Sequence, residues 1–330
     1  MTQVAAEAGV SHQTVSRVLN GSPLVKQETR ERVLAAIEQL GYRRNNAART
    51  LVTNRSGRIG MISAHLALHG PSMIAVSVQE AGHAAGYELA LVGVSDFSTR
   101  AVNSAVDRLL DEAVEALVVA VAHRDAIDRA RSLHLPVPVV LVQGVASGEP
   151  LAAGIDQVLG AQLATEHLLD LGHRHVAHVT GPVDWVEAWQ RREGWQRAHE
   201  LRGLLPGPEL TGDWSAADGY AAGQRIADDP AVTAVFVAND TMALGLLHAL
   251  HERGVDVPGQ VSVVGFDDVP EAVYLWPSLT TVSQQFSVLG RTAVDLTVRA
   301  LAGEVEPSAD LIAPQLVVRS STAAPAAVAR

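Results

Sequence analysis

A group of polar side chains near the N-terminus has the types and spacing that can read the edges of DNA bases. An i, i+4 spacing places four of them on one face of a helix that would run from Ser11 to about Asn20. These four are His12, Gln13, Ser16 and Arg17. Arginine can bond guanine through two atoms, glutamine can do the same for adenine, and a helix fits the major groove. Gln13 and Arg17 are therefore the expected base readers, and the alternative is an ordinary solvated helix face.

A second group of polar side chains follows apolar, β-rich runs later in the chain. Asn239 and Asp267 each come after such a run, and the carboxyl ends of parallel strands are where α/β sheets bind ligands. Paired amide and carboxylate groups suit the neighbouring hydroxyls of a sugar, and Arg191 can add donors. Trp214 and Phe286 can stack on the apolar face of a sugar ring. The pattern indicates a sugar site. The alternatives are that Asp267 or Asp240 caps a helix, that Trp214 is a core residue and that Arg191 pairs with Glu187 one turn earlier.

Two different patterns of elements must position these groups. Through residue 52, apolar residues recur only at helical spacing. Gly9 and Ser11 lie where a first helix would end and a second would begin, and such a short break is typical of a helix-turn-helix. From Arg58 on, short apolar strands alternate with helices in two successive series. We therefore predict an all-α head followed by two α/β lobes with parallel sheets.

Charge is distributed unevenly along the 330 residues. The formal net charge is -11, yet residues 1–58 hold nine Lys and Arg against four Asp and Glu, and the remainder holds 16 against 32. A basic end on an acidic body is typical of a protein that meets phosphates at one end. With 48% hydrophobic and 18% charged residues, the chain is expected to fold into several domains.

Several function classes find no support in the sequence. The absence of cysteine excludes disulfides, thiolate metal sites and a cysteine nucleophile. With no export signal and no apolar run of about 18 residues, we expect a cytoplasmic protein without a membrane partner. With no G-x-S-x-G elbow, phosphate loop or G-x-G-x-x-G fingerprint, we expect no enzyme and no cofactor. His173, His175 and His178 lack a suitably placed acid, so no metal site is expected.

The head resembles that of the lactose repressor family of bacterial transcriptional regulators. The strings GVSHQTVSRVLN and TRERVLAAIEQLGYRRNNAARTL carry this resemblance in both motif and spacing. It implies that His12, Gln13 and Arg17 occupy the recognition positions. It also implies contacts to the DNA backbone, which set position without reading sequence, from Ser11, Ser16, Asn20 and Thr29. One departure is Lys26, which replaces the hydroxyl residue usual at the cap of the third helix.

The segment NNAARTLV, from Asn45 to Val52, is too short to be stable in water as an isolated helix. In the family, this hinge orders against its dimer mate on DNA, and the residue that matches Leu51 wedges into the minor groove. Such a wedge kinks DNA. An effector that separates the two hinges would then release the DNA. The alternative is a plain linker in which Leu51 covers the core of the head.

The later strings LALHGPS, GDWSA, VANDTMALG, SVVGFDD and LTTVSQQF resemble the sensor of the member that gives the family its name. By matching position, the resemblance implies an effector-binding set of Ser72, Arg191, Trp214, Asn239, Asp267, Gln284 and Phe286. Gln143 stands where that member has an acid, and it can still bond a hydroxyl while removing a negative charge. Trp185 and Trp189 are expected to alter the mouth of the pocket. A galactoside is the effector that the resemblance favours.

The expected organisation is a periplasmic-binding-protein-like sensor attached to the helical head. We expect a helix-turn-helix domain, a hinge with linker, a sensor and a disordered tail over 1–44, 45–57, 58–322 and 323–330. Within the sensor, we expect lobe 1 over about 58–155 plus 286–308, and lobe 2 over about 156–285 plus 309–322. These boundaries predict that the chain crosses between the lobes more than once.

The function expected from head, hinge and sensor is a sequence-specific repressor whose affinity for its operator is controlled by a small sugar. One recognition helix reads only a few base pairs, so we expect a homodimer on palindromic operator DNA. The final AAPAAVAR has no leucine heptads, which predicts no four-chain bundle. A repressor with a purine or other corepressor is an alternative. A sugar-binding transport protein is another, but it would need an export signal and has no use for a basic head.

Overall fold

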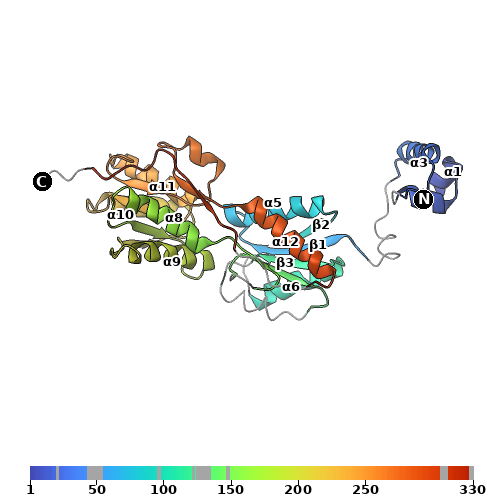
Figure 1. Ribbon diagram of the computed structural model, residues 1–330, viewed down its shortest axis with the longest axis horizontal. Coiled ribbons are helices and arrows are strands. Elements are labelled where there is room, and N and C mark those ends of the chain that lie inside the picture. The colour runs from blue at the N-terminus through green and yellow to red at the C-terminus, as the bar shows by residue number, and fades with distance from the viewer. Residues whose placement is uncertain are drawn as a thin grey trace. The chain divides into compact units, whose positions relative to one another are not determined.

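The computed structural model describes residues 1–19, 22–42, 55–94, 98–120, 123, 135–145, 149–304 and 311–326. The chain divides into two compact units, Met1–Ser56 and Gly57–Arg330 (Figure 1). The expected DNA contacts Asn20, Asn45 and Leu51 lie outside the described residues. In the part of the chain that is described, no helix is long and apolar enough to cross a membrane.

The first unit contains three short helices, α1 (Thr2–Glu7), α2 (His12–Leu19) and α3 (Gln27–Gln39). Their shared core is built from small and β-branched side chains, namely Val4, Ala5, Ala8, Val15, Val18, Val33 and Ala36. The hydroxyl of Ser11 accepts a hydrogen bond of 3.1 Å from the backbone N–H of Thr14, so it caps α2 as expected. At the start of α3, Lys26 makes no side-chain cap hydrogen bond.

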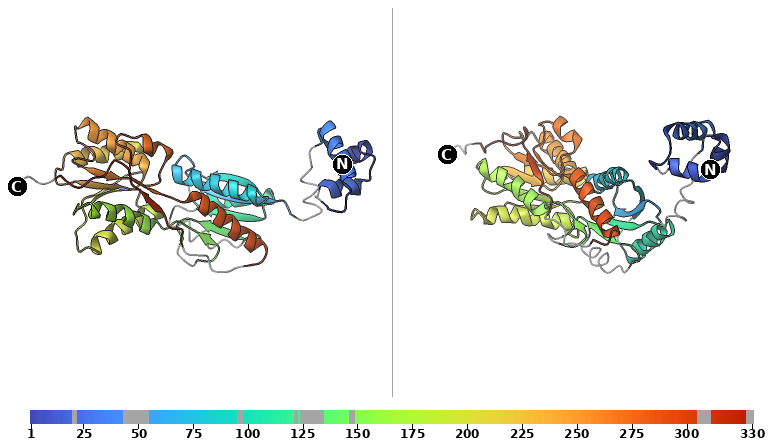
Figure 2. Two further views of the ribbon diagram at one scale, coloured as in Figure 1. Left: turned by 45° about the horizontal axis from the view of Figure 1, so that its top comes forward. Right: turned by 45° about the vertical axis from the view of Figure 1, so that its right-hand side comes forward.

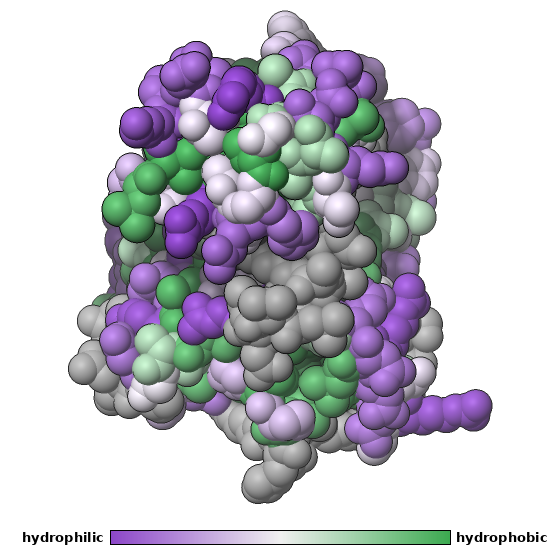
Figure 3. All heavy atoms as spheres, turned by 90° about the vertical axis from the view of Figure 1, so that its right-hand side faces the viewer, coloured by the Kyte–Doolittle hydropathy of each residue, from purple (hydrophilic) through white to green (hydrophobic). Residues whose placement is uncertain are grey.

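Leu40 continues the helical spacing of Val33 and Ile37 in the sequence, but it is not a core residue. It follows the last residue of α3 as its C-cap, and it is 42% exposed. Ala36 takes the buried position instead. Figure 3 shows one face of the molecule, on which hydrophilic residues predominate and hydrophobic residues lie between them in small groups. Single exposed leucines of this kind are normal on protein surfaces.

The second unit begins with a five-stranded parallel sheet in the order β2-β1-β3-β4-β5. Its strands are β1 (Arg58–Ala64), β2 (Glu88–Val94), β3 (Ala116–Ala120), β4 (Val139–Val142) and β5 (Ala152–Ala153). Side chains alternate between the two faces of a strand. Ile59 and Met61 therefore pack with α5 (His69–Ala84) and α12 (Phe286–Leu301), whereas Ile62 packs with α6 (Thr99–Asp111). Helices α5 and α12 lie side by side in Figure 1 and Figure 2.

A second parallel sheet has the order β7-β6-β8-β9. Its strands are β6 (Ala177–Thr180), β7 (Glu209–Thr211), β8 (Ala234–Val237) and β9 (Ser262–Val264). One face packs against α8 (Gln157–Asp170) and α9 (Val186–Glu200). The other face packs against α10 (Ala216–Ala227) and α11 (Asp240–Glu252). Two parallel sheets flanked by helices were predicted from the alternation of strands and helices, and that prediction is confirmed.

The chain connects the two sheets through segments that come together from distant parts of the sequence. After η1 (Pro270–Tyr274), β10 (Thr281–Ser283) pairs antiparallel with β11 (Gln315–Val317). Ile155, just after β5, forms a parallel bridge with Ile312. Helix α12 packs against the first sheet, and β11 lies beside β10. The chain therefore crosses from one sheet to the other after β5, before α12 and again before β11.

The C-terminal end departs from the expected disordered tail at its first residue. The backbone of Ala323 bonds the hydroxyl of Ser262 through both its N–H and its carbonyl oxygen, each at 3.0 Å. That carbonyl also lies 3.0 Å from Nε2 of His173. The ordered chain therefore extends past the boundary set at 322, because these backbone groups find partners at the edge of the second sheet.

Candidate functional site

Helix α2 presents the polar face that the sequence predicted for base reading. His12, Gln13 and Arg17 are exposed, whereas Val15 and Val18 on the opposite face are buried in the head core. Ser16 on α2 and Thr29 in the first turn of α3 are half-buried. The result is a helix whose outer side offers an imidazole, an amide and a guanidinium, groups that can bond base edges and phosphates.

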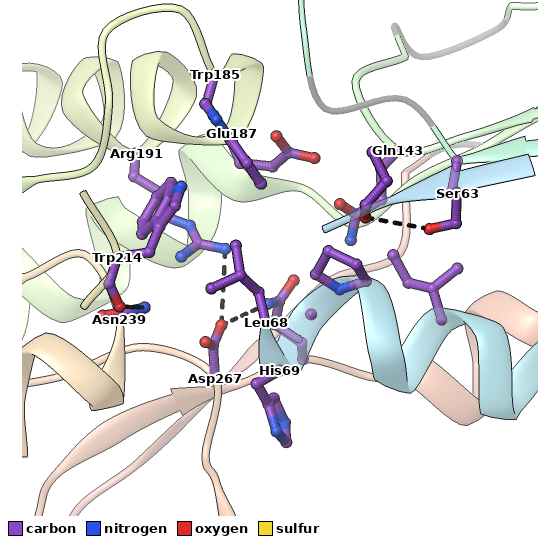
Figure 4. A pocket seen from close by; sticks show the side chains of 16 residues that line it. Ser63, Leu68, His69, Gln143, Trp185, Glu187, Arg191, Trp214, Asn239 and Asp267 are labelled. Atoms are coloured by element: carbon purple, nitrogen blue, oxygen red, sulfur yellow. Dashed lines mark hydrogen bonds and ion pairs between the residues drawn. The ribbon is translucent and has the colours of Figure 1, made fainter. Parts of the chain in front are cut away.

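The second unit contains a pocket at the carboxyl ends of both sheets (Figure 4). Ser63 and Ala64 are the last two residues of β1, Ala120 is the last residue of β3, and Gln143 directly follows β4. The second sheet contributes residues that follow its strands, and α9 contributes further side chains. The pocket is lined by Ser63, Ala64, Leu68, His69, Gly70, Pro71, Ile74, Ala120, Gln143, Trp185, Glu187, Arg191, Trp214, Asn239, Asp267 and Gln284.

Most of the side chains expected to bind an effector are brought together in this pocket. The six that line it are Gln143, Arg191, Trp214, Asn239, Asp267 and Gln284. The other two do not line it. Ser72 lies half-buried on α5, one residue beyond the lining residue Pro71. Phe286 is 6% exposed and packs in the core of the first sheet.

Arg191 is buried, and its guanidinium is held by two hydrogen bonds, an ion pair and an aromatic ring. Its Nε donates to Oε1 of Gln157 at 2.9 Å, and Nη1 donates to the carbonyl oxygen of Ala238. Nη2 lies 3.7 Å from Oδ1 of Asp267, and the guanidinium carbon lies 3.8 Å from the ring centroid of Phe266. The alternative of a pair along the helix with the residue one turn earlier is therefore wrong, because Asp267 takes that place.

Four side chains close into a ring at the base of the pocket. Gln157 receives the bond from Arg191 and donates through Nε2 to Oε1 of Gln284 at 2.9 Å. Gln284 in turn donates to Oδ1 of Asp267 at 2.7 Å. The Asp267 carboxylate is thus fixed through one oxygen. Burial raises its pKa, and the charges of Arg191 and His69 oppose that rise.

Asn239 and Trp214 hold each other in place at the side of the pocket. Oδ1 of Asn239 accepts from the backbone N–H of Met242 at 2.8 Å and caps α11, while Nδ2 donates to the carbonyl oxygen of Trp214 at 3.1 Å. The indole of Trp214 lies against Gly181, where any Cβ would collide with the ring. Nε1 of Trp214 is buried and has no hydrogen-bond partner among the described residues.

Three lining residues other than glycine have the left-handed backbone conformation. Their φ angles are 65° for Gln143, 75° for Trp214 and 117° for Asp267. This conformation costs a bulky L residue about 1–3 kcal/mol and is concentrated at ligand sites. All three follow strand ends, so the backbone strain serves to turn their side chains into the pocket.

Sequence reasoning missed several lining residues. His69 lies within the string LALHGPS, but the resemblance pointed to Ser72, three residues later, and α5 begins at His69. Glu187 was considered only as a partner for Arg191. Gln157, which is not in the lining but holds Arg191, had no signal in the sequence at all, because its contact spans 34 residues.

A helix-turn-helix head with an exposed polar face, joined to a two-lobed α/β unit with a polar pocket at its strand ends, defines a DNA-binding regulator that carries a ligand-binding sensor. Comparison with known proteins agrees with this class. Residues 1–45 match the bacterial regulatory proteins of the lacI family, and residues 165–322 match a periplasmic binding protein-like domain.

Matches to individual proteins extend over nearly the whole chain. It is 36% identical to the lactose operon repressor of Escherichia coli (strain K12), over 98% of this chain and 90% of that protein. It is 32% identical to the HTH-type transcriptional repressor PurR of Haemophilus influenzae (strain PittEE), over 96% of this chain and 97% of the relative. The chain belongs to the lacI family of bacterial regulatory proteins.

A solved structure supports the same assignment. The crystal structure of the lac repressor dimer bound to operator and the anti-inducer ONPF matches with a TM-score of 0.86 and 34% identity. The match covers 97% of this chain and 98% of that chain. The resemblance that the head and sensor strings indicated is therefore confirmed.

Proposed function

We propose that this protein is a cytoplasmic transcriptional repressor that binds a palindromic operator as a homodimer and is controlled by a small sugar, with a galactoside as the first candidate. The observation that carries the proposal is the pocket in which Asp267, Asn239 and Trp214, from the strand ends of the second sheet, converge with Arg191 of α9. The chain is 36% identical to a lactose operon repressor, and the solved lac repressor dimer is bound to operator.

On the DNA side, α2 would enter the major groove with Gln13 and Arg17 facing the bases. Ser16 and Thr29 would contact the DNA backbone, as would Asn20 and Asn45. Ser11 would also contact it, although its hydroxyl lies 2.9 Å from that of Thr14 and already caps α2. The proposed head is 1–44, and the proposed hinge is 45–57 with Leu51 as the wedge.

On the effector side, the sugar would bind between the two lobes. Asp267 is fixed through Oδ1, which leaves Oδ2 to accept from a hydroxyl. Trp214 would cover an apolar ring face. Phe286 would act indirectly, because its ring lies 5.9 Å from that of the lining residue His69, and Ser72 stays a prediction. The protein would bind the sugar without chemical change, so no enzyme activity is proposed.

The test is a thermal-shift panel of sugars combined with operator binding. A galactoside should raise the melting temperature of the wild-type protein through binding linkage and should weaken its binding to operator DNA. The relatives include a repressor named PurR, so a purine base belongs in the panel as the competing corepressor. A shift with the purine and none with any sugar would overturn the proposed effector.

A further inference from the structure

Glu187 is a buried acid in the pocket, and one of its two carboxylate oxygens has no hydrogen-bond partner among the described residues. It lies in the first turn of α9, is 5% exposed and lines the pocket. Its Oε2 is fully buried and accepts no hydrogen bond from the described residues. Figure 4 shows the carboxylate pointing away from the guanidinium of Arg191, into the open space on the side of Gln143. A carboxylate in such a place is costly unless something donates to it.

The charged groups around Glu187 do not satisfy it. On its own helix, Arg191 is bonded to Gln157, to a backbone carbonyl and to Asp267. Burial raises the pKa of Glu187 to about 7, and the charge of Asp267 adds to this rise, whereas a bond from the backbone of Glu187 itself and the charge of Arg191 oppose it. His69 lowers the pKa of Asp267, and the imidazole of His123 lies 3.4 Å from Asp184.

The opposite wall of the pocket also offers an unused polar group. Gln143 is 8% exposed, lines the pocket from the first sheet and makes no side-chain hydrogen bond among the described residues. Trp185 packs edge-on against Trp214 with ring centroids 5.5 Å apart, which gives this end an apolar corner. The end of the pocket around Glu187 therefore combines an unpartnered carboxylate oxygen, an amide without a side-chain hydrogen bond among the described residues and indole surface.

We infer that Glu187 is a specificity-determining residue that accepts a hydrogen bond from a hydroxyl or amino group of the effector and selects neutral or amino sugars over sugar phosphates and sugar acids. This inference rests on the proposed sugar sensor. Two carboxylates and one guanidinium line the pocket, and the guanidinium is already bonded to one of those carboxylates. An anionic group on the ligand that lies beside Glu187 would be repelled by its carboxylate.

The inference carries a dependence on pH. The ionised carboxylate is the stronger acceptor, so binding should weaken as Glu187 takes up a proton. With its pKa at about 7, affinity for a neutral sugar should fall between about pH 8 and about pH 6, by up to about tenfold. A protonated carboxyl can still bond a hydroxyl, so the loss should stay below that limit.

The experiment is calorimetric titration of the full chain with methyl galactoside, lactose, methyl glucoside, galactosamine, galactose 6-phosphate and galacturonate. The wild-type protein should bind a neutral or amino sugar at least about tenfold more tightly than either anionic one. Glu187→Gln should weaken the binding of the neutral sugars, remove the pH dependence of that binding and reduce the preference for neutral over anionic sugars. Glu193→Gln, an exposed position on the same helix, is the matched control and should change none of these.

The outcomes separate the inference from the proposal beneath it. If the wild-type protein binds a neutral sugar and Glu187→Gln binds that sugar as tightly as the wild-type protein does at both pH values, the inference is overturned and the sugar sensor stands. If an anionic sugar binds as tightly as the neutral ones, the inference is also overturned. If none of the six sugars binds, the proposed sugar effector fails and the inference fails with it.

Discussion

Replacing Glu187 by glutamine is expected to stabilise the ligand-free protein at mildly alkaline pH. Burial raises the pKa of this carboxyl from 4.5 to about 7. The folded protein therefore holds the proton more tightly than the unfolded chain, so the side chain destabilises the fold when ionised, and this cost fades as the pH falls toward 4.5. At about 1.4 kcal/mol per pKa unit, the cost is about 3 kcal/mol near pH 8 and about 1 kcal/mol near pH 5.

The substitution recovers only part of this free energy. A buried glutamine amide without a partner costs about 1 kcal/mol itself, so the expected net gain is about 2 kcal/mol near pH 8 and close to zero near pH 5. For a unit of this size, with roughly 2 °C per kcal/mol, the melting temperature should rise by about 4 °C at the higher pH.

Circular dichroism melts of the wild-type protein, Glu187→Gln and Glu193→Gln at both pH values measure this effect. The exposed Glu193 on the same helix controls for the loss of one negative charge from α9. A rise that is equal at both pH values would point to helix propensity and not to an unpaired carboxylate. A lower melting temperature near pH 8 would refute the reasoning directly, because it would mean that Glu187 has a stabilising partner.

Three further predictions concern the head and the pocket. Arg17→Ala should weaken operator binding by about 1–3 kcal/mol and leave sugar binding intact, as measured by fluorescence anisotropy and calorimetry; equal loss of both would contradict the division of labour. Asp267→Ala should abolish the melting-temperature rise caused by a bound galactoside, and a retained rise would remove Asp267 from the site. Gly181→Ala should cost about 1–3 kcal/mol of stability, because its Cβ would displace the Trp214 indole; an unchanged chemical denaturation curve would contradict this.

The sequence allowed the fold class to be predicted because its local patterns agree with the tertiary structure. The strings RIGMISA and AVFV are apolar runs that form β1 and β8 with nearly complete burial. Small residues also mark positions of close approach, as at Gly245, where a Cβ would collide with the carbonyl oxygen of Ala216. The end of a helix was harder to predict, because Leu40 keeps the apolar spacing after α3 has already ended.

The pocket was less predictable because its partners are distant in sequence. An i, i+4 spacing made Glu187 the obvious partner of Arg191, whereas the structure brings Gln157 and Asp267 to that guanidinium from other elements. Phe286 was expected to stack on the sugar, but it begins α12 and packs toward the first sheet. Spacing along one element cannot reveal such contacts, because they depend on how two sheets meet.

The ring beneath the pocket gives a physical route from a bound ligand to the connections between the lobes. Gln157 begins α8 immediately after the crossing that follows β5, and Gln284 lies in the crossing before α12. Both are bonded into the ring that holds Asp267. A ligand can shift a conformational equilibrium only by binding its two states with different affinity. A sugar bonded to the free Oδ2 of Asp267 would contact that ring directly. A change in the angle between the lobes that moves Asp267 within the ring would therefore also change the affinity for the sugar.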